Sequence, residues 1–240
     1  MPEKNTPLIY DVTLGPITDF GNETKQFDLF FEPGKGMAFT AGQFVAVLCL
    51  NEGKVIRRAY SIASAPEQKS HLSLVIKLVE GGAVTNWFWS LKEGQKIQVH
   101  GPFGKFILPS PVDFDPVFVA TGTGIAPFRS MIGNLLANGF RKKIGLLFGS
   151  RYDNMIPYHG EFTELAKRHQ NFTYVPTVSR PGPEWKGETG YVQTKIEKFF
   201  SDPSGRRVYI CGLNEMIQAV QEICLKQGYQ KGQISFEKYD

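Results

Sequence analysis

The sequence predicts a chain of two parts, a small antiparallel β-barrel followed by an α/β region built on a parallel sheet. Three observations support this division. Short apolar or alternating runs, broken by proline and glycine, fill the first part up to about residue 108. From Val117 onward, strand-like and helix-like runs alternate, as in parallel strands joined by helices. The segment 108–113 between them contains two prolines, so we expect domains at 1–110 and 111–240.

The first part contains short strands separated by turns. The clearest strand candidates cover 24–31, 43–50 and 71–79. In the last of these, Leu72, Leu74, Ile76 and Leu78 occupy every second position, which predicts one buried face. Many short strands with such turns indicate a small antiparallel barrel. One short helix is expected after Gly82, over 86–91.

The second part alternates strands with helices. Its strand candidates are 117–121, 143–149, 172–178, 207–211 and 233–238. Its helix candidates are 126–138, 159–168, 191–200 and 214–227. This order predicts a five-stranded parallel sheet wrapped by helices.

The junction of the first parallel strand and its helix is the most informative segment. Four apolar residues, 117–120, lead into Thr121-Gly122-Thr123-Gly124, and Pro127 follows in the first helical turn. Such a loop directs backbone N–H groups and the positive end of a helix dipole to one point, which suits a phosphate. On this segment alone, an ordinary strand-to-helix turn remains the alternative.

A second segment, 57–62, closes a β-rich stretch in the first part. Its guanidinium (Arg58), phenol ring (Tyr60) and hydroxyl (Ser61) suit a diphosphate, a flat heterocycle and a hydrogen-bond acceptor, respectively. In an extended strand, Arg58 and Tyr60 share one face and Ser61 takes the other. Taken alone, such a segment is more often a plain strand with a surface arginine.

Together with the glycine loop about 60 residues later, this segment resembles the ferredoxin–NADP reductase family, whose flavin motif is Arg-x-Tyr-Ser and whose nucleotide motif is Gly-Thr-Gly-Ile-Ala-Pro-Phe. Four further segments carry the resemblance: Gly81-Gly82-Ala83-Val84-Thr85, Gly101-Pro102-Phe103-Gly104, Cys211-Gly212-Leu213-Asn214-Glu215-Met216 and Glu237-Lys238-Tyr239. The resemblance implies a six-stranded antiparallel Greek-key barrel that binds FAD, followed by a five-stranded Rossmann-like domain that binds NAD(P).

The resemblance also implies roles in the flavin site. Arg58 would pair with the diphosphate, Tyr60 would pack on the isoalloxazine, and Ser61 would bond the reactive ring nitrogen. Backbone N–H groups at 82–85 would cradle the diphosphate, assisted by the Thr85 hydroxyl, which favours FAD over FMN. Lys77 is either a diphosphate or ribose contact or a solvated lysine. The expected flavin-binding set is Arg58, Ala59, Tyr60, Ser61, Ile76, Lys77, Gly82, Ala83, Val84 and Thr85.

The nicotinamide nucleotide is expected at the carboxyl ends of the parallel strands. Arginine and serine suit the 2′-phosphate that distinguishes NADP(H), and Ser179-Arg180 and Arg151 follow two of these strands. We expect NADP(H); NAD(H) stays open because the pattern Trp185-Lys186-Gly187-x-x-Gly190 resembles some NADH-linked relatives, and both arginines could be plain loop residues. The expected nucleotide-binding set is Thr121, Gly122, Thr123, Gly124, Arg151, Ser179, Arg180, Cys211, Gly212, Met216 and Tyr239.

Four residues are expected at the reacting atoms: Ser61, Cys211, Glu237 and Tyr239. In relatives, the cysteine helps to orient the nicotinamide and the Glu-x-aromatic tail closes the flavin site. Glu237 is a candidate proton relay. Cys211 could equally be a small buried core residue. The extra residue Asp240 leaves the placement of the tail open.

Composition excludes several other classes. Three cysteines cannot form a disulfide framework or ligate an iron–sulfur cluster, and the four histidines show no metal-ligand spacing, so no metal site is expected. A net charge of +4 without a Lys/Arg run argues against a nucleic-acid partner. No apolar stretch is long enough for a membrane span, and no signal pattern occurs at the N-terminus, so we expect a cytoplasmic protein.

The sequence therefore predicts an FAD-dependent NADPH reductase that passes single electrons to a separate ferredoxin or flavodoxin. An NAD(P)H:flavin reductase and the NADH-dependent reductase component of a multicomponent oxygenase are the enzymatic alternatives. A non-catalytic electron-transfer subunit of a larger complex is the alternative of a different class.

Overall fold

The computed structural model describes residues 8–21, 23–51 and 53–239. They form two compact units. One comprises the described residues up to 108 together with 126–138, and the other comprises 109–125 and the described residues from 139 onward. The domain division expected at residue 110 stays a prediction. One helix, α2 (Ile125–Ala137), follows the glycine loop in the sequence, yet nearly all of it packs with the first unit.

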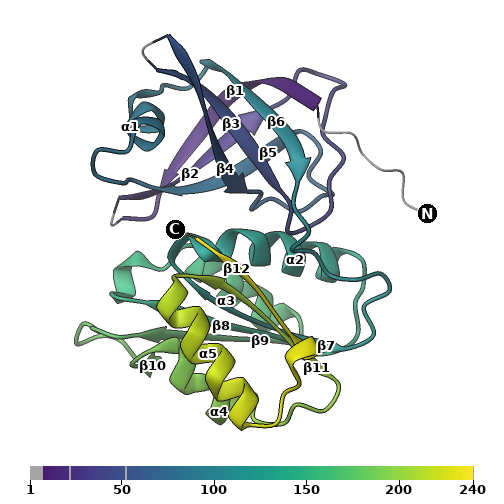
Figure 1. Ribbon diagram of the computed structural model, residues 1–240. Coiled ribbons are helices and arrows are strands. Elements are labelled where there is room, and N and C mark those ends of the chain that lie inside the picture. Colours follow the sequence, from purple (N-terminus) through teal and green to yellow (C-terminus); the bar gives the residue numbers. More distant parts are fainter. Residues whose placement is uncertain (1–7, 22, 52, 240) are drawn as a thin grey trace. The chain divides into compact units, whose positions relative to one another are not determined.

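The first unit is a curled antiparallel sheet of six strands, which confirms the expected barrel (Figure 1). The strands are β1 (Leu8–Asp19), β2 (Thr24–Phe30), β3 (Phe44–Asn51), β4 (Lys54–Ser61), β5 (His71–Lys77) and β6 (Lys96–Phe103), in the order β4-β3-β6-β1-β2-β5. A bridge between Ile62 and Leu74 joins the end of β4 to β5, so the two edge strands of the sheet meet. The short helix α1 (Ala83–Ser90) follows β5.

One strand of the barrel is buried more fully than its sequence predicts. Residues 72–76 of β5 are all buried, so the expectation of a single buried face is wrong. Ser73 is tolerated in the interior because its hydroxyl donates to Asp28 Oδ1 (2.6 Å) and its N–H donates to Ser64 Oγ (3.1 Å). Apolar Val75 adds to the burial of the same face.

The second unit is built on a parallel sheet with helices on both faces. Its strands are β7 (Asp115–Thr121), β8 (Ile144–Ser150), β9 (Phe172–Val178), β10 (Glu188–Thr189), β11 (Arg206–Gly212) and β12 (Ile234–Lys238), in the order β10-β9-β8-β7-β11-β12. The five expected strands are present, and the two-residue β10 adds a sixth at one edge. The expected helix at 191–200 is shorter, a 3₁₀ turn (Val192–Lys195) that continues into α4 (Ile196–Phe199).

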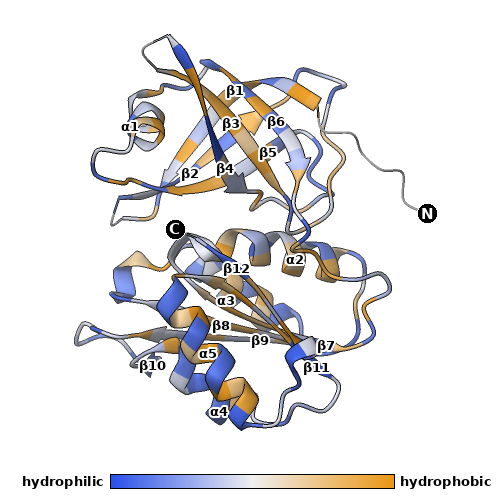
Figure 2. Cartoon of the chain, viewed as in Figure 1, coloured by the Kyte–Doolittle hydropathy of each residue, from blue (hydrophilic) through white to orange (hydrophobic). Residues whose placement is uncertain are grey.

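Helices α3 (His159–Arg168) and α5 (Asn214–Lys226) cover opposite faces of this sheet. Phe162 of α3 contacts Phe172 and Tyr174, whereas α5 packs its buried side chains with Val175, on the other face of the same strand. Hydrophilic and hydrophobic residues both appear along α5, as expected for a helix that buries only one side (Figure 2). None of the helices among the described residues has the length and apolarity of a membrane span.

Candidate functional site

The flavin motif occupies the end of β4, an edge strand. Arg58 and Tyr60 stand opposite the buried residues Val47 and Val45 of β3, so both lie on the inner face of the sheet. Tyr60 packs against the Phe88 ring with centroids 5.6 Å apart, and burial raises the pKa of its hydroxyl to about 12. The Arg58 side chain is exposed, and its Nη1 donates to the Arg57 carbonyl (3.0 Å). Arg58 therefore offers an accessible cation beside a fixed aromatic ring.

The remaining strand residues expected at the flavin differ in exposure. Ser61 is buried and Ala59 is exposed. On β5, Ile76 lies in the apolar core, so its side chain is not available to a ligand, whereas the Lys77 side chain is exposed.

The expected diphosphate turn leads into α1. Gly81 has a φ of +70°, and a Cβ on Gly82 would lie 2.7 Å from Thr85 Oγ1, so the turn needs both glycines. The Thr85 hydroxyl donates to the Gly82 carbonyl (3.1 Å) and accepts from the Val79 N–H (3.2 Å), so it is occupied in shaping the turn. No side chain caps α1, and the N–H groups of 83–85 stand at the helix N-terminus, which is chemistry that fits a diphosphate.

The expected nucleotide loop follows β7 as a 3₁₀ turn (Gly122–Gly124) that leads into α2. Gly122 has a φ of +56°. A Cβ on Gly124 would overlap the Cys211 carbonyl oxygen, and one on Gly212 would lie 2.5 Å from Thr121 Oγ1 and 2.7 Å from Met216 Cε. The loop and the end of β11 therefore pack backbone to backbone, which brings together most of the expected nucleotide-binding residues; Thr123 lies in the loop between the two glycines.

One buried polar atom at this junction lacks a hydrogen-bond partner among the described residues. Thr121 Oγ1 is buried and makes no hydrogen bond with the described part of the chain. A buried hydroxyl without a partner is costly, and a bound ligand would satisfy it. The junction thus fits the polar edge of a nucleotide.

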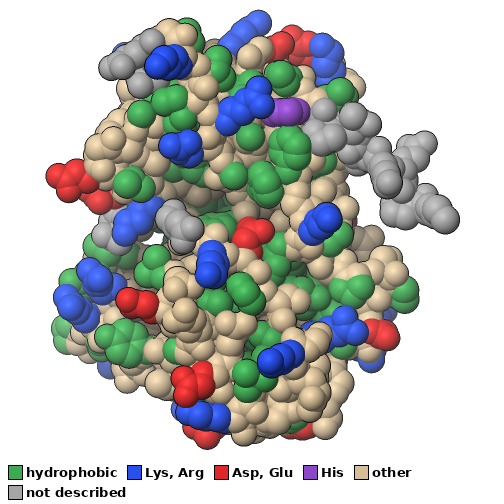
Figure 3. Space-filling view, in the orientation of Figure 1, with side chains coloured by type: hydrophobic (Ala, Val, Ile, Leu, Met, Phe, Trp, Pro, Cys, Tyr) green, Lys and Arg blue, Asp and Glu red, His purple; other side chains and the backbone are tan. Residues whose placement is uncertain are grey.

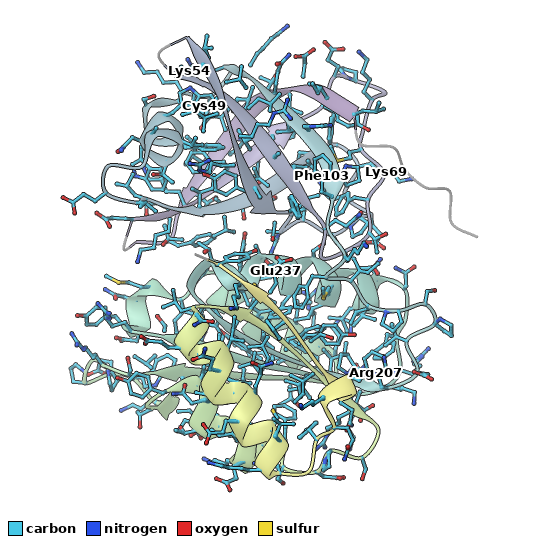
Figure 4. All side chains as sticks on the ribbon, viewed as in Figure 1. Cys49, Lys54, Lys69, Phe103, Arg207 and Glu237 are labelled. Atoms are coloured by element: carbon cyan, nitrogen blue, oxygen red, sulfur yellow. The ribbon has the colours of Figure 1, made fainter. Side chains whose placement is uncertain are left out.

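Cys211, Glu237 and Tyr239 also meet at the carboxyl end of the sheet. Cys211 pairs with Glu237 between β11 and β12, and the Tyr239 N–H donates to the Gly212 carbonyl (3.1 Å). Burial and the nearby Glu237 carboxylate raise the pKa of the Cys211 thiol well above its usual value, against a smaller opposing effect of a hydrogen bond with Tyr239. The thiol is therefore protonated at neutral pH and is not a nucleophile. Figure 4 shows Glu237 and Arg207 toward opposite ends of β12 and β11.

The two arginines expected at a 2′-phosphate are neighbours. The Arg180 N–H donates to the Arg151 carbonyl (2.8 Å), and the Ser179 N–H donates to the Ser150 carbonyl (3.0 Å). These bonds extend the pairing of β8 with β9 beyond the carboxyl ends of the two strands. Arg151 and Arg180, both exposed, therefore lie side by side there. On the face shown in Figure 3, basic side chains are scattered among acidic and apolar ones. No group of three metal-ligating side chains occurs among residues 8–21, 23–51 and 53–239.

Sequence reasoning missed a set of contacts made by α2. Arg129 and Ser130 donate to backbone carbonyls of Ala63 and Ser64. The polar pair Arg129-Ser130, directly after Pro127-Phe128 of the nucleotide motif, was the only hint of these contacts in that motif. The motif does not show which segment of the chain accepts their hydrogen bonds.

Comparison with known proteins identifies two family domains along the chain. Residues 11–107 match the oxidoreductase FAD-binding domain, and residues 118–222 match the oxidoreductase NAD-binding domain. The chain is 35% identical over 238 residues to ferredoxin–NADP reductase B of Sorangium cellulosum, covering 95% of this chain and 96% of that protein. It is 36% identical over 187 residues to the phenol 2-monooxygenase reductase component DmpP of a Pseudomonas strain, but spans only 52% of that protein.

Solved structures agree with this assignment. The cytochrome P450 reductase GcoB of Amycolatopsis superposes with a TM-score of 0.86 at 27% identity, covering 97% of this chain and 71% of that chain. A ferredoxin–NADP⁺ reductase of Neisseria gonorrhoeae superposes with a TM-score of 0.83 over 96% of this chain and 98% of that chain; at 22% identity it supports the fold alone.

Proposed function

This chain belongs to the ferredoxin–NADP reductase family and is an NAD(P)H-dependent flavoprotein oxidoreductase, and from this premise we propose that it exchanges electrons between NADP(H) and a ferredoxin or flavodoxin. The main support for this proposal is that the chain is similar to a ferredoxin–NADP reductase along 96% of that protein. Bound FAD would supply the redox chemistry that links a hydride donor, NADPH, to acceptors of single electrons.

The residues of the first unit would hold the flavin. Arg58 would neutralise diphosphate charge together with the N–H groups at the start of α1, and Lys77 would add a second cation. Tyr60 would offer its ring to the isoalloxazine, because an edge contact with Phe88 already holds the Tyr60 ring in place. Ser61 would donate a hydrogen bond to the flavin ring.

The residues of the second unit would hold the nucleotide. Loop 121–124 and the start of α2 would bind the diphosphate, and Thr121 Oγ1 would bond the nicotinamide end. The adjacent Arg151 and Arg180 support NADP(H), because two guanidinium groups and the Ser179 hydroxyl match a 2′-phosphate. Cys211 is fully buried, so its neutral thiol would support the end of the nucleotide loop from within the core, and Glu237 would hold or move a proton.

A second candidate function is supported by one observation, the 36% identity to a phenol 2-monooxygenase reductase component. In that role the chain would use NADH and serve an oxygenase through a separate iron–sulfur carrier. The expected cytoplasmic location stays a prediction under either function.

Anaerobic titration of the as-purified protein with NADPH and with NADH, followed by flavin absorbance, tests the proposal. We expect NADPH to bleach the flavin band at lower concentration than NADH, and the reduced protein then to reduce ferredoxin or flavodoxin. A strong preference for NADH would favour the oxygenase component. Failure of both nucleotides to reduce the flavin would refute a reductase function.

A further inference from the structure

Helix α2 is tied to a segment of the barrel unit by a row of side-chain hydrogen bonds. The segment comprises residues 63–67, here called the anchor segment, which begins two residues after Ser61. Ser130 Oγ donates to the Ser64 carbonyl (2.7 Å), and Arg129 Nη1 donates to the Ala63 carbonyl (3.0 Å). The helix and the anchor segment belong to the same compact unit.

The same face of α2 continues the attachment toward its far end. Asn134 Nδ2 and Asn138 Nδ2 both donate to Glu67 Oε1, at 2.6 and 2.7 Å. Between these bonds, a Cβ on Gly133 would lie only 3.1 Å from the Ala65 Cβ, so the small residue permits the close approach. The attachment therefore runs along more than two turns of the helix.

Buried polar groups extend this attachment into the barrel. Ser64 Oγ accepts the Ser73 N–H, and Ser73 Oγ donates to Asp28. Ser64, Ser73 and Ser130 are at most 3% exposed. A buried hydroxyl destabilises the folded state unless it makes a hydrogen bond. A network in which the buried hydroxyls are bonded therefore favours a single arrangement of the groups it joins.

The two ends of this network lead to the two candidate binding segments. The anchor segment continues from the flavin motif on β4, and α2 continues from the nucleotide loop 121–124. We propose that Ser130 and Arg129 are positioning residues for hydride transfer. They fix α2, which follows the nucleotide loop in the chain, to the anchor segment, which follows the flavin motif. This inference rests on the proposed function.

The physical basis is the steep dependence of transfer rates on geometry. A displacement of about 1 Å at the reacting atoms can lower a rate about a hundredfold. Loss of the Ser130 bond would let α2 shift against the anchor segment. The loop is continuous with α2 and packs on the end of β11, so the loop and that strand end would move together. Binding of the nucleotide diphosphate should change little, because its expected contacts keep their places relative to one another.

The test compares Ser130→Ala with Tyr229→Phe. Tyr229 Oη donates to the Phe200 carbonyl at the same 2.7 Å, is also buried, and lies outside both candidate sites, so it is a matched control. We expect both variants to lower the thermal midpoint by similar amounts. Only Ser130→Ala should slow flavin reduction at saturating NADPH, by at least about fivefold, with the dissociation constant of NADP⁺ changed less than about twofold.

Hydrogen exchange supplies a readout that does not depend on activity. In the as-purified protein, amides of the anchor segment and of 121–125 should exchange faster in Ser130→Ala than in Tyr229→Phe. If Ser130→Ala does not fold, Glu67→Ala serves instead, since Glu67 is exposed and accepts two of the bonds. Equal reduction rates and equal exchange in variant and control would overturn the proposal, whereas a wild-type flavin that no nucleotide reduces would overturn the proposed function itself.

Discussion

Arg58 and Tyr60 share one face of β4, yet their surroundings differ. Tyr60 is held by Phe88 and half-buried, whereas Arg58 reaches solvent and donates to the neighbouring Arg57 carbonyl. A side chain that the protein already holds gives up little freedom when a ligand binds, and a solvated cation gains new charge-assisted bonds. The two residues should therefore contribute to flavin retention in different ways.

We predict that Arg58→Ala weakens FAD binding more than Tyr60→Phe does. Each charge-assisted bond to the diphosphate contributes roughly 1.5–3 kcal/mol, so the arginine variant should lose about ten- to a hundredfold in affinity. Phenylalanine keeps the ring packed on Phe88 and should cost less than about threefold. Fluorescence titration of the flavin-depleted variants measures both constants, and equal losses would contradict the assignment of Arg58.

The adjacent arginines allow a second prediction. Arg180→Ala should raise the KM for NADPH about ten- to a hundredfold and leave the KM for NADH nearly unchanged, because only NADPH carries the 2′-phosphate. The kcat should move little, since this contact is equal in ground and transition states. Arg151→Ala should act in the same direction.

Arg141→Ala is the control for this pair. Arg141 is also an exposed arginine, but it lies before the amino end of β8, whereas Arg151 follows the carboxyl end of the same strand. Steady-state kinetics with both nucleotides provides the measurement. If Arg180→Ala behaves as Arg141→Ala does, the arginines are ordinary loop residues.

At the scale of elements, the junction of the nucleotide loop with β11 depends on backbone contact. Gly124→Ala would place a methyl group on the Cys211 carbonyl, so the loop must shift. We predict loss of at least about tenfold in NADP⁺ affinity with FAD content retained. Gly160→Ala is the control, because a Cβ at Gly160 meets nothing within 4 Å. Calorimetric titration with NADP⁺ measures the affinity, and unchanged binding by Gly124→Ala would exclude this loop as the diphosphate site.

Local patterns predicted the elements with strong periodicity. The strand run 172–178 and the helix run 159–168 coincide with β9 and α3, because alternation and helical spacing report the neighbouring layer directly. Residues 191–200 were harder. Four residues of that run form a 3₁₀ turn and the next four form α4. Val192 and Ile196 of these two elements are buried in the core of the second unit, a tertiary contact that helix propensity does not report.

Long-range partners could not be predicted. The burial of Ser73 depends on Asp28 and Ser64, which lie far from it in the chain or in a loop without periodicity. Likewise, the motif at 121–128 located α2, but nothing in its spacing identified the anchor segment as its partner. Thr85 was expected to assist a ligand, and its bonds to Val79 and Gly82 give it a role in the turn.

At the scale of the whole molecule, burial of neutral acids ties stability to alkaline pH. Burial raises the pKa of the Cys224 thiol to about 12 and that of the Tyr60 hydroxyl to about 12, and it also raises the pKa of Cys211. Below the unfolded values, near 9 for a thiol, both states are protonated and the folded state keeps its full stability. Above that pH the unfolded chain loses its protons first, so the free energy of unfolding falls until the folded group also ionises.

We predict that Cys224→Ala removes one part of this pH dependence. Between about pH 9 and 12, the unfolding free energy of the wild type should fall faster than that of the variant, by up to about 1.4 kcal/mol per pH unit, because one titrating thiol is gone. At neutral pH the variant should be slightly less stable, since the lost sulfur leaves a small cavity.

Val220→Ala is the control: it opens a cavity on the same buried side of α5 without removing a thiol. It should be destabilised equally at every pH, with the wild-type slope. Urea denaturation of the second unit under reducing conditions, across this pH range, gives both slopes. Parallel curves for wild type and Cys224→Ala would show that the Cys224 thiol ionises as readily in the folded chain as in the unfolded one.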